Sequence, residues 1–131
     1  RGMTFIVSEE ERMEIAVLNL RAGEKAMSLA TFLISASYLK AGISLLSEDQ
    51  WEKHYDLSLQ LYSLYAEAEY CNGRFQEVGY LAGLVIQEAE SFQSKLSVYA
   101  TLMRALGAQN KLEDAIGIGI DILTQLGVQN L

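Results

Sequence analysis

An all-α fold is predicted for this 131-residue chain from three observations. The chain contains no proline, although turns and strand ends usually carry several and long helices exclude it. Apolar residues recur at helical spacing along most of the sequence. The helical segments also resemble one another in pairs. This predicts a single domain over residues 1–131, built as a helical-repeat stack of about three helix-turn-helix hairpins.

The first hairpin is predicted over residues 9–46. Ser8 and Glu11 have the spacing of a capping box, in which each side chain accepts a hydrogen bond from a backbone amide that the helix leaves free. A first helix should therefore begin after Ser8. Ala22-Gly23 is expected to mark the end of this helix or a bend, and a second helix is expected over about 25–46.

The middle hairpin is predicted over residues 50–90. Between Tyr55 and Tyr70 the polar residues fall on one narrow stripe, so this central helix should have neighbours on most of its sides. The helix is expected to end at Asn72-Gly73, because glycine readily adopts the left-handed conformation that closes a helix. A second helix then follows over about 74–90.

The third hairpin is predicted over residues 92–126. Ser91 has the position of an N-cap for its first helix, and Asn110 with Glu113 has the cap spacing for its second. Apolar residues of the last helix, near 111–126, cover more than one face. A following hairpin is therefore expected to pack against it in the intact protein.

The second helices of the hairpins align at offsets of 42 residues (33 to 75) and 37 residues (75 to 112). Each hairpin places a small residue where two helices must approach closely. This arrangement is typical of tetratricopeptide-type repeats, although the spacing between these hairpins exceeds the usual repeat length of about 34 residues. The aligned positions are Leu33/Ala36/Lys40/Ile43, Phe75/Val78/Ala82/Val85 and Leu112/Ala115/Gly119/Ile122.

Four segments carry a resemblance to a known family: LNLRAGEKAM (18–27), WEKHYDLSLQLY (51–62), AEYCNGRFQE (68–77) and QNKLEDAIGIGIDILTQLGV (109–128). Together they resemble the tetratricopeptide-like helical region of large multidomain signalling proteins. Those proteins join a serine/threonine kinase-like domain and a predicted AAA/STAND-type ATPase to this region, often followed by GAF and histidine kinase modules. The resemblance implies that this chain is a fragment lying between a nucleotide switch and an output module.

Composition and charge exclude several classes of function. The formal net charge is -7 with no basic cluster, so nucleic acid and anionic membrane surfaces are poor partners. The apolar run over residues 29–39 is too short to span a bilayer. A single cysteine, Cys71, favours a reducing, cytoplasmic setting. The chain has no phosphate-binding loop or kinase motif, and we expect no cofactor and no metal site.

Four tyrosines are the candidate partner-binding residues. They lie on the first helices of the hairpins, which line the concave groove in stacks of this type, and tyrosine combines a large contact area with a polar tip. Core packing between the hairpins is the competing explanation for each of them. The four residues are Tyr55, Tyr62, Tyr65 and Tyr99.

Two residues, His54 and Cys71, are of types that could take part in chemistry. His54 is the only histidine, but no nucleophile or second carboxylate converges with it in the sequence pattern, which favours a structural role. Cys71 lies near Glu67 and Glu69, whose negative charges should raise the pKa of its thiol and leave it unreactive. We therefore expect no catalytic residue and no enzymatic activity.

The sequence predicts a non-enzymatic regulatory module of a multidomain signalling ATPase or kinase, which couples a nucleotide switch to an output domain. Its partners would be other proteins or neighbouring domains of the same chain, and its exposed helical ends could pair two copies. The alternative is a self-contained helical bundle that binds a small ligand near His54.

Overall fold

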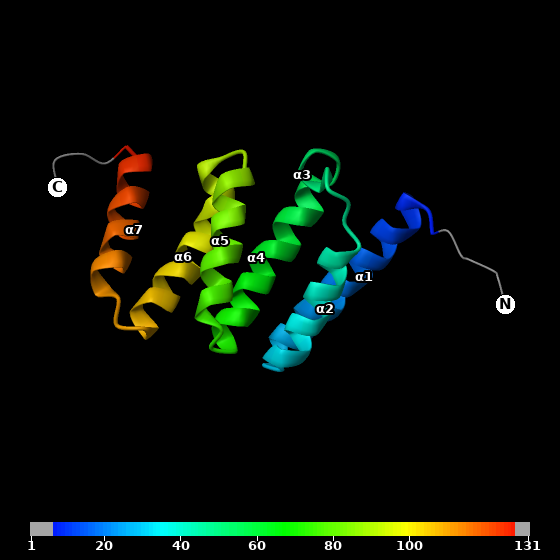
Figure 1. Cartoon of the computed structure of the whole chain (residues 1–131), viewed down its shortest axis with the longest axis horizontal. Coiled ribbons are helices and arrows are strands. Elements are labelled where there is room, and N and C mark those ends of the chain that lie inside the picture. Colours follow the sequence, from blue (N-terminus) through cyan, green and yellow to red (C-terminus); the bar gives the residue numbers. More distant parts are fainter. Residues whose placement is uncertain (1–6, 128–131) are drawn as a thin grey trace.

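The computed structural model describes residues 7–127, and within this range the chain forms seven α-helices and no β-strand. The helices are α1 (Glu9–Ser28), α2 (Phe32–Ser44), α3 (Gln50–Lys53), α4 (Tyr55–Cys71), α5 (Phe75–Glu88), α6 (Phe92–Ala108) and α7 (Leu112–Gln125). The helices form hairpins that follow one another along the molecule, with α1 and α7 toward opposite ends (Figure 1). The prediction of an all-α fold is confirmed.

The long helices pack in sequence order, α1 on α2, α2 on α4, α4 on α5, α5 on α6 and α6 on α7. In addition, α4 contacts both α1 and α6. Loops of three residues join α1 to α2, α4 to α5 and α6 to α7, so these pairs are antiparallel hairpins. None of the helices in the described range is long and apolar enough to cross a bilayer.

One turn geometry closes all three hairpins. In each loop the second residue has a positive φ, and the third donates its backbone N–H to the carbonyl five residues earlier at 2.9 Å. This is the Schellman arrangement, which satisfies carbonyls left free at a helix end. The residues with positive φ are Ala30 (59°), Gly73 (77°) and Asn110 (60°). The bonds run from Thr31 to Ala26, from Arg74 to Glu69 and from Lys111 to Leu106.

The first of these turns lies later in the chain than the sequence indicated. Helix α1 continues through Ala22 and Gly23 to Ser28. Gly23 is needed inside the helix, because a Cβ there would lie 2.6 Å from Cδ2 of Leu39 on α2. The chain reverses at Ala30, and residues with a Cβ rarely adopt its positive φ, so no local signal marked the turn.

The register of α2 differs by one residue from the sequence alignment. The first two turns are 43 residues apart (30 to 73), so Phe32, and not Leu33, takes the position of Phe75 and Leu112. Burial agrees with this register, since Leu33 is 63% exposed and Leu39 is 0% exposed. The second and third turns are 37 residues apart (73 to 110), as the sequence predicted.

Side-chain caps begin two of the helices as predicted. At α1 the Ser8 N–H donates to Glu11 Oε1 at 3.1 Å, and the Glu11 N–H donates to Ser8 Oγ at 3.1 Å, which completes the capping box. At α6 the Ser94 N–H donates to Ser91 Oγ at 3.2 Å. The cap predicted at Asn110 is wrong, because this residue takes the positive φ of the turn.

Two clusters of buried side chains hold the hairpins together. The first spans the junction of the first two hairpins, where Leu39 of α2 and Leu61 of α4 are both 0% exposed. The second spans the next junction and joins Ala82 and Val85 of α5 to Val98 of α6. The core is therefore distributed over successive junctions between hairpins rather than concentrated at one centre.

Candidate functional site

A cleft of about 330 Å³ lies between α2 and α5, with α4 contributing residues between them. Tyr62 and Tyr65 of α4 and Tyr80 of α5 supply aromatic rings to its walls. Lys40 of α2 and Arg74 in the turn before α5 carry positive charge, Glu77 of α5 carries negative charge, and all three are exposed. An apolar cleft with a few charged groups can hold a side chain or short segment of a partner.

A buried carboxylate lies at the base of this cleft. Glu69 is 1% exposed, and its Oε2 lies 3.6 Å from Nη1 of Arg74. Its Oε1 accepts a hydrogen bond at 3.2 Å from Nδ2 of Asn72, and the same amide nitrogen lies 3.1 Å from the carbonyl oxygen of Phe32. Glu69 thus helps to fix the turn after α4 against the start of α2, and it is compensated by partners as a buried charge must be.

The environment of Tyr65 keeps its phenol protonated. Burial raises the pKa of Tyr65, and the negative charges of Glu69 and Glu77 raise it further, partly opposed by Arg74. Its ring is 9% exposed. The cleft therefore offers a neutral hydroxyl beside a carboxylate, which can form hydrogen bonds but supplies no nucleophile.

Two of the four predicted tyrosines lie in this cleft, and two lie elsewhere. Tyr62 is half-buried, with its ring 5.4 Å from that of Trp51. Tyr55 is also half-buried, and its hydroxyl accepts a hydrogen bond at 2.8 Å from the backbone N–H of Glu90, just after α5. Tyr99 is 6% exposed, so little of its ring is available to a partner.

Tyr99 instead joins the two helices of the third hairpin. Its hydroxyl accepts a hydrogen bond at 3.1 Å from Nε2 of Gln125 on α7, and its ring lies 6.1 Å from that of Phe92. Binding through the four tyrosines stays a prediction. Packing within and between hairpins already accounts for most of the contacts of Tyr55 and Tyr99.

The search for partner-binding residues was limited to tyrosines on the first helices of the hairpins, so it missed Lys40, Arg74 and Tyr80, and it treated Glu69 only as a neighbour of Cys71. The cleft lies instead between two second helices, α2 and α5. Tyr80 is 66% exposed in the middle of α5, and an exposed aromatic residue on a helix is the signal that could have identified it.

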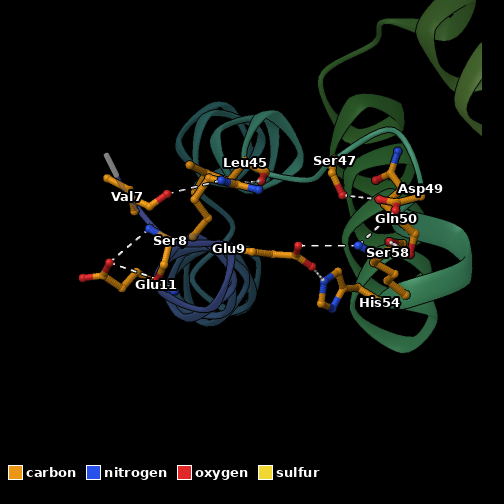
Figure 2. A network of polar contacts seen from close by, with 12 residues as sticks. Val7, Ser8, Glu9, Glu11, Leu45, Ser47, Asp49, Gln50, His54 and Ser58 are labelled. Atoms are coloured by element: carbon orange, nitrogen blue, oxygen red, sulfur yellow. Dashed lines mark hydrogen bonds and ion pairs between the residues drawn. The ribbon is translucent and has the colours of Figure 1, made fainter. Parts of the chain in front are cut away.

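The other candidate position, His54, lies where the predicted central helix is interrupted. Its φ of -133° and ψ of 53° separate α3 from α4. Figure 2 shows the side chain of Glu9 reaching from α1 to the His54 ring, with Glu9 Oε2 2.7 Å from His54 Nε2. Lys53 Nζ lies 3.7 Å from the other carboxylate oxygen of Glu9. These contacts of Glu9 tie the start of α1 to the junction between α3 and α4.

The pKa of Glu9 is lowered by its hydrogen bond to His54 and then by the charge of Lys53, with burial acting in the opposite direction. A carboxyl group with a lowered pKa stabilises the fold above its ordinary value of 4.5, and this contribution is lost as the pH falls through the lowered value. Because Glu9 and Lys53 are largely exposed, we expect the contribution to be small.

His54→Ala is therefore expected to lower the melting temperature slightly at pH 7. The difference from the parent chain should shrink as the pH falls below 4.5, the ordinary pKa of a glutamate, because Glu9 then becomes protonated in both proteins. Circular dichroism at several pH values measures this. In a Glu9→Gln background His54→Ala should add little. An unchanged melting temperature together with loss of ligand binding would favour a ligand site at His54 instead.

The thiol of Cys71 is exposed. Partial removal of the thiol from water raises the pKa of Cys71. The negative charge of Glu67 raises this pKa further, and the positive charge of Arg104 lowers it. The direction agrees with the sequence prediction, so the thiolate is a minor species at neutral pH and the residue is a poor nucleophile.

Comparison with known proteins gives one informative similarity. The "Hybrid signal transduction histidine kinase G" of Dictyostelium discoideum is 26% identical over 136 residues, an alignment that covers 97% of this chain. The chain spans about 4% of the length of that protein. No family model matches the chain, and no solved structure matches it. The similarity to a signalling protein thus extends over nearly the whole chain.

Proposed function

We propose that this chain is a non-enzymatic, tetratricopeptide-like helical-repeat region of a larger signalling protein. The observation that carries the proposal is the Schellman turn, repeated with the same 2.9 Å bond in all three hairpins. A row of hairpins closed in the same way, each packed on its neighbours, is the organisation of helical repeat proteins, whose extended surfaces bind other proteins.

The similarity to a hybrid signal transduction histidine kinase supports a place in signalling. An alignment over 97% of this chain and 4% of that protein fits a small region within a long multidomain chain. In this proposal the helical region couples a nucleotide-binding switch, of the AAA/STAND or kinase type, to an output domain. The mechanism is geometric, because rigid hairpins packed in series transmit a displacement along their row.

The cleft between α2 and α5 is the docking position that we propose for a partner segment. Its rings suit an apolar or aromatic side chain, and the exposed Lys40 suits an acidic group of the partner, whereas Arg74 is already paired with Glu69. The partner is another protein or a neighbouring domain of the same chain. The polar groups of the cleft make binding contacts, and we propose that the segment catalyses no reaction.

The size of the native protein tests the first part of this proposal. An immunoblot of source material with an antibody against this segment should show a band far above 14.5 kDa, the mass of the 131-residue chain. A band near 14.5 kDa would contradict a region of a larger protein.

Photo-crosslinking tests the docking position. A photoreactive phenylalanine analogue at Tyr80, which lines the cleft, should capture one defined peptide in the native protein, and mass spectrometry identifies it. The matched control carries the analogue at Gln93, an exposed residue of α6 outside the cleft lining. Lys40→Glu should lower the yield at position 80 severalfold, because it reverses the charge offered to the partner. Equal capture at both positions would count against the cleft.

A second candidate function rests on a cavity of about 490 Å³ where the first half of α1 meets His54. Met13 and Val17 give it an apolar surface, and Glu9 and His54 lie at its edge. A small apolar ligand could bind there in a self-contained bundle. The His54→Ala measurement described above separates this alternative from the structural role of the ion pair.

A further inference from the structure

Helix α7 carries an apolar surface that the rest of the described chain leaves open. None of its residues is fully buried, although its sequence is as apolar as that of α5. Leu123 is 37% exposed and Leu126 is 57% exposed. Apolar surface of this extent on one helix indicates an interaction site.

The repeated turns give each residue of α7 an equivalent on α2 and α5. A residue of the first hairpin corresponds to the residue 43 positions later in the second hairpin. A residue of the second hairpin corresponds to the residue 37 positions later in the third. Four positions of the second helix carry the packing onto the next hairpin. They are Leu39, Gly42, Ile43 and Leu46 in the first hairpin, Ala82, Val85, Ile86 and Ala89 in the second, and Gly119, Ile122, Leu123 and Leu126 in the third, where the last residue of each set lies just after the helix.

On α2 and α5 these four positions form the junction with the following helix. Leu39 packs in the cluster that includes Leu61 of α4, and Val85 packs with Val98 of α6. Both Leu61 and Val98 are 0% exposed, and they occupy the same position in their helices, 37 residues apart (61 to 98). On α7 the four positions are equally apolar, but among the described residues no helix follows to cover them.

Ile120 of α7 is also exposed, but its equivalents on α2 and α5 do not lie in a junction. Ile120 is 56% exposed, nearly the same as Leu126. Its equivalents are Gly83 on α5 and Lys40 on α2, and both are exposed although their helices have a following neighbour. The stacking surface therefore includes Leu123 and Leu126 and excludes Ile120.

We infer that this surface of α7 receives the first helix of a further hairpin, which continues the row. That helix should present an aliphatic side chain at the position of Leu61 and Val98, because this residue fills the centre of both junctions seen here. The inference deepens the proposed function and rests on it in one respect, namely that the native chain is longer.

A second copy of this chain is a poorer occupant, because its α1 would have to serve as the next first helix. The residues of α4 that pack in the first junction include Leu57, Leu61, Leu64 and Ala68. Their equivalents on α1, 43 residues earlier, are Glu14, Leu18, Arg21 and Lys25. Docking α1 onto α7 would thus bring three charged side chains into an apolar junction, which is costly.

Hydrogen exchange of the native protein tests this inference. Peptides from α7 should exchange about tenfold more slowly, or slower still, in the native protein than in the isolated 131-residue chain, because the added helix protects them. Peptides from α4 should exchange at similar rates in both.

Two matched variants identify the surface. Leu126→Lys in the native protein should return α7 to the fast exchange of the isolated chain, whereas Ile120→Lys should leave it slow. Both side chains are similarly exposed in the isolated chain, so neither variant should change its melting temperature.

Three outcomes would overturn the inference. One is equally fast exchange of α7 in both proteins, which leaves the proposed function standing if the native band is large. Another is an equal effect of the two lysine variants. The third is protection of α7 in the isolated chain that rises with protein concentration and disappears with Leu126→Lys, which would make a second copy the occupant.

Discussion

Leu61→Ala is expected to lower the free energy of unfolding by about 2–5 kcal/mol. Leu61 is 0% exposed and packs in the cluster that joins α4 to α2, so its truncation leaves a cavity at the junction of two hairpins. Urea unfolding followed by the fluorescence of Trp51 measures the loss, because Trp51 is the one tryptophan of the chain and lies against Tyr62 of α4.

Leu18→Ala is the matched control for this experiment. Leu18 occupies the same position on α1, 43 residues before Leu61, but it is 67% exposed. Its truncation should change the free energy of unfolding by no more than about 0.5 kcal/mol. Equal losses from the two substitutions would show that position in the row does not determine burial, contrary to the junctions described here.

Gly23→Ala is expected to destabilise the chain by about 1–3 kcal/mol, even though alanine is the better helix former. A Cβ at this position would lie 2.6 Å from Cδ2 and 2.7 Å from Cγ of Leu39. Leu39 is 0% exposed in a packed junction, so either its side chain or the two helices must shift to make room. The same urea titration measures the effect.

Gly83→Ala should have the opposite sign. Gly83 lies inside α5 with no atom within 4 Å of an added Cβ, so alanine should stabilise the helix by about 0.5–1 kcal/mol. If both glycine substitutions stabilised the chain, the close approach of α1 and α2 would not constrain Gly23.

Much of the fold could be predicted from local signals in the sequence. Ser8 with Glu11, Ser91, and Asn72-Gly73 all act at the places where they were expected. In each case the residue that gives the signal also makes the bond or adopts the backbone conformation. A helix end can be predicted from the sequence where the residue that is typical of it also forms it.

The first hairpin could not be predicted in the same way, because tertiary packing determined it. Gly23 resembles a helix end in the sequence, yet it provides room for Leu39. Ala30 resembles a helix interior residue, yet it takes a positive φ of 59° in the turn. Likewise the interruption at His54 has no glycine or proline to announce it.

The candidate site was predicted only in part, for a related reason. Tyr62 and Tyr65 belong to the cleft, but its charged residues are brought together from α2, α4, the turn before α5 and α5 itself, namely Lys40, Glu69, Arg74 and Glu77. The spacing of these residues along the chain does not indicate that they lie close together in the folded protein. Only the packing of one hairpin on the next assembles them.

The row of hairpins has a consequence for how the chain folds and unfolds. Each helix packs mainly on its neighbours in sequence, so most contacts form by the closure of short loops, and folding should be fast. The middle hairpin has a neighbour on both sides, whereas α7 has no fully buried residue. Heating should therefore open the chain progressively from α7 inward, with loss of the last hairpin preceding loss of the first two.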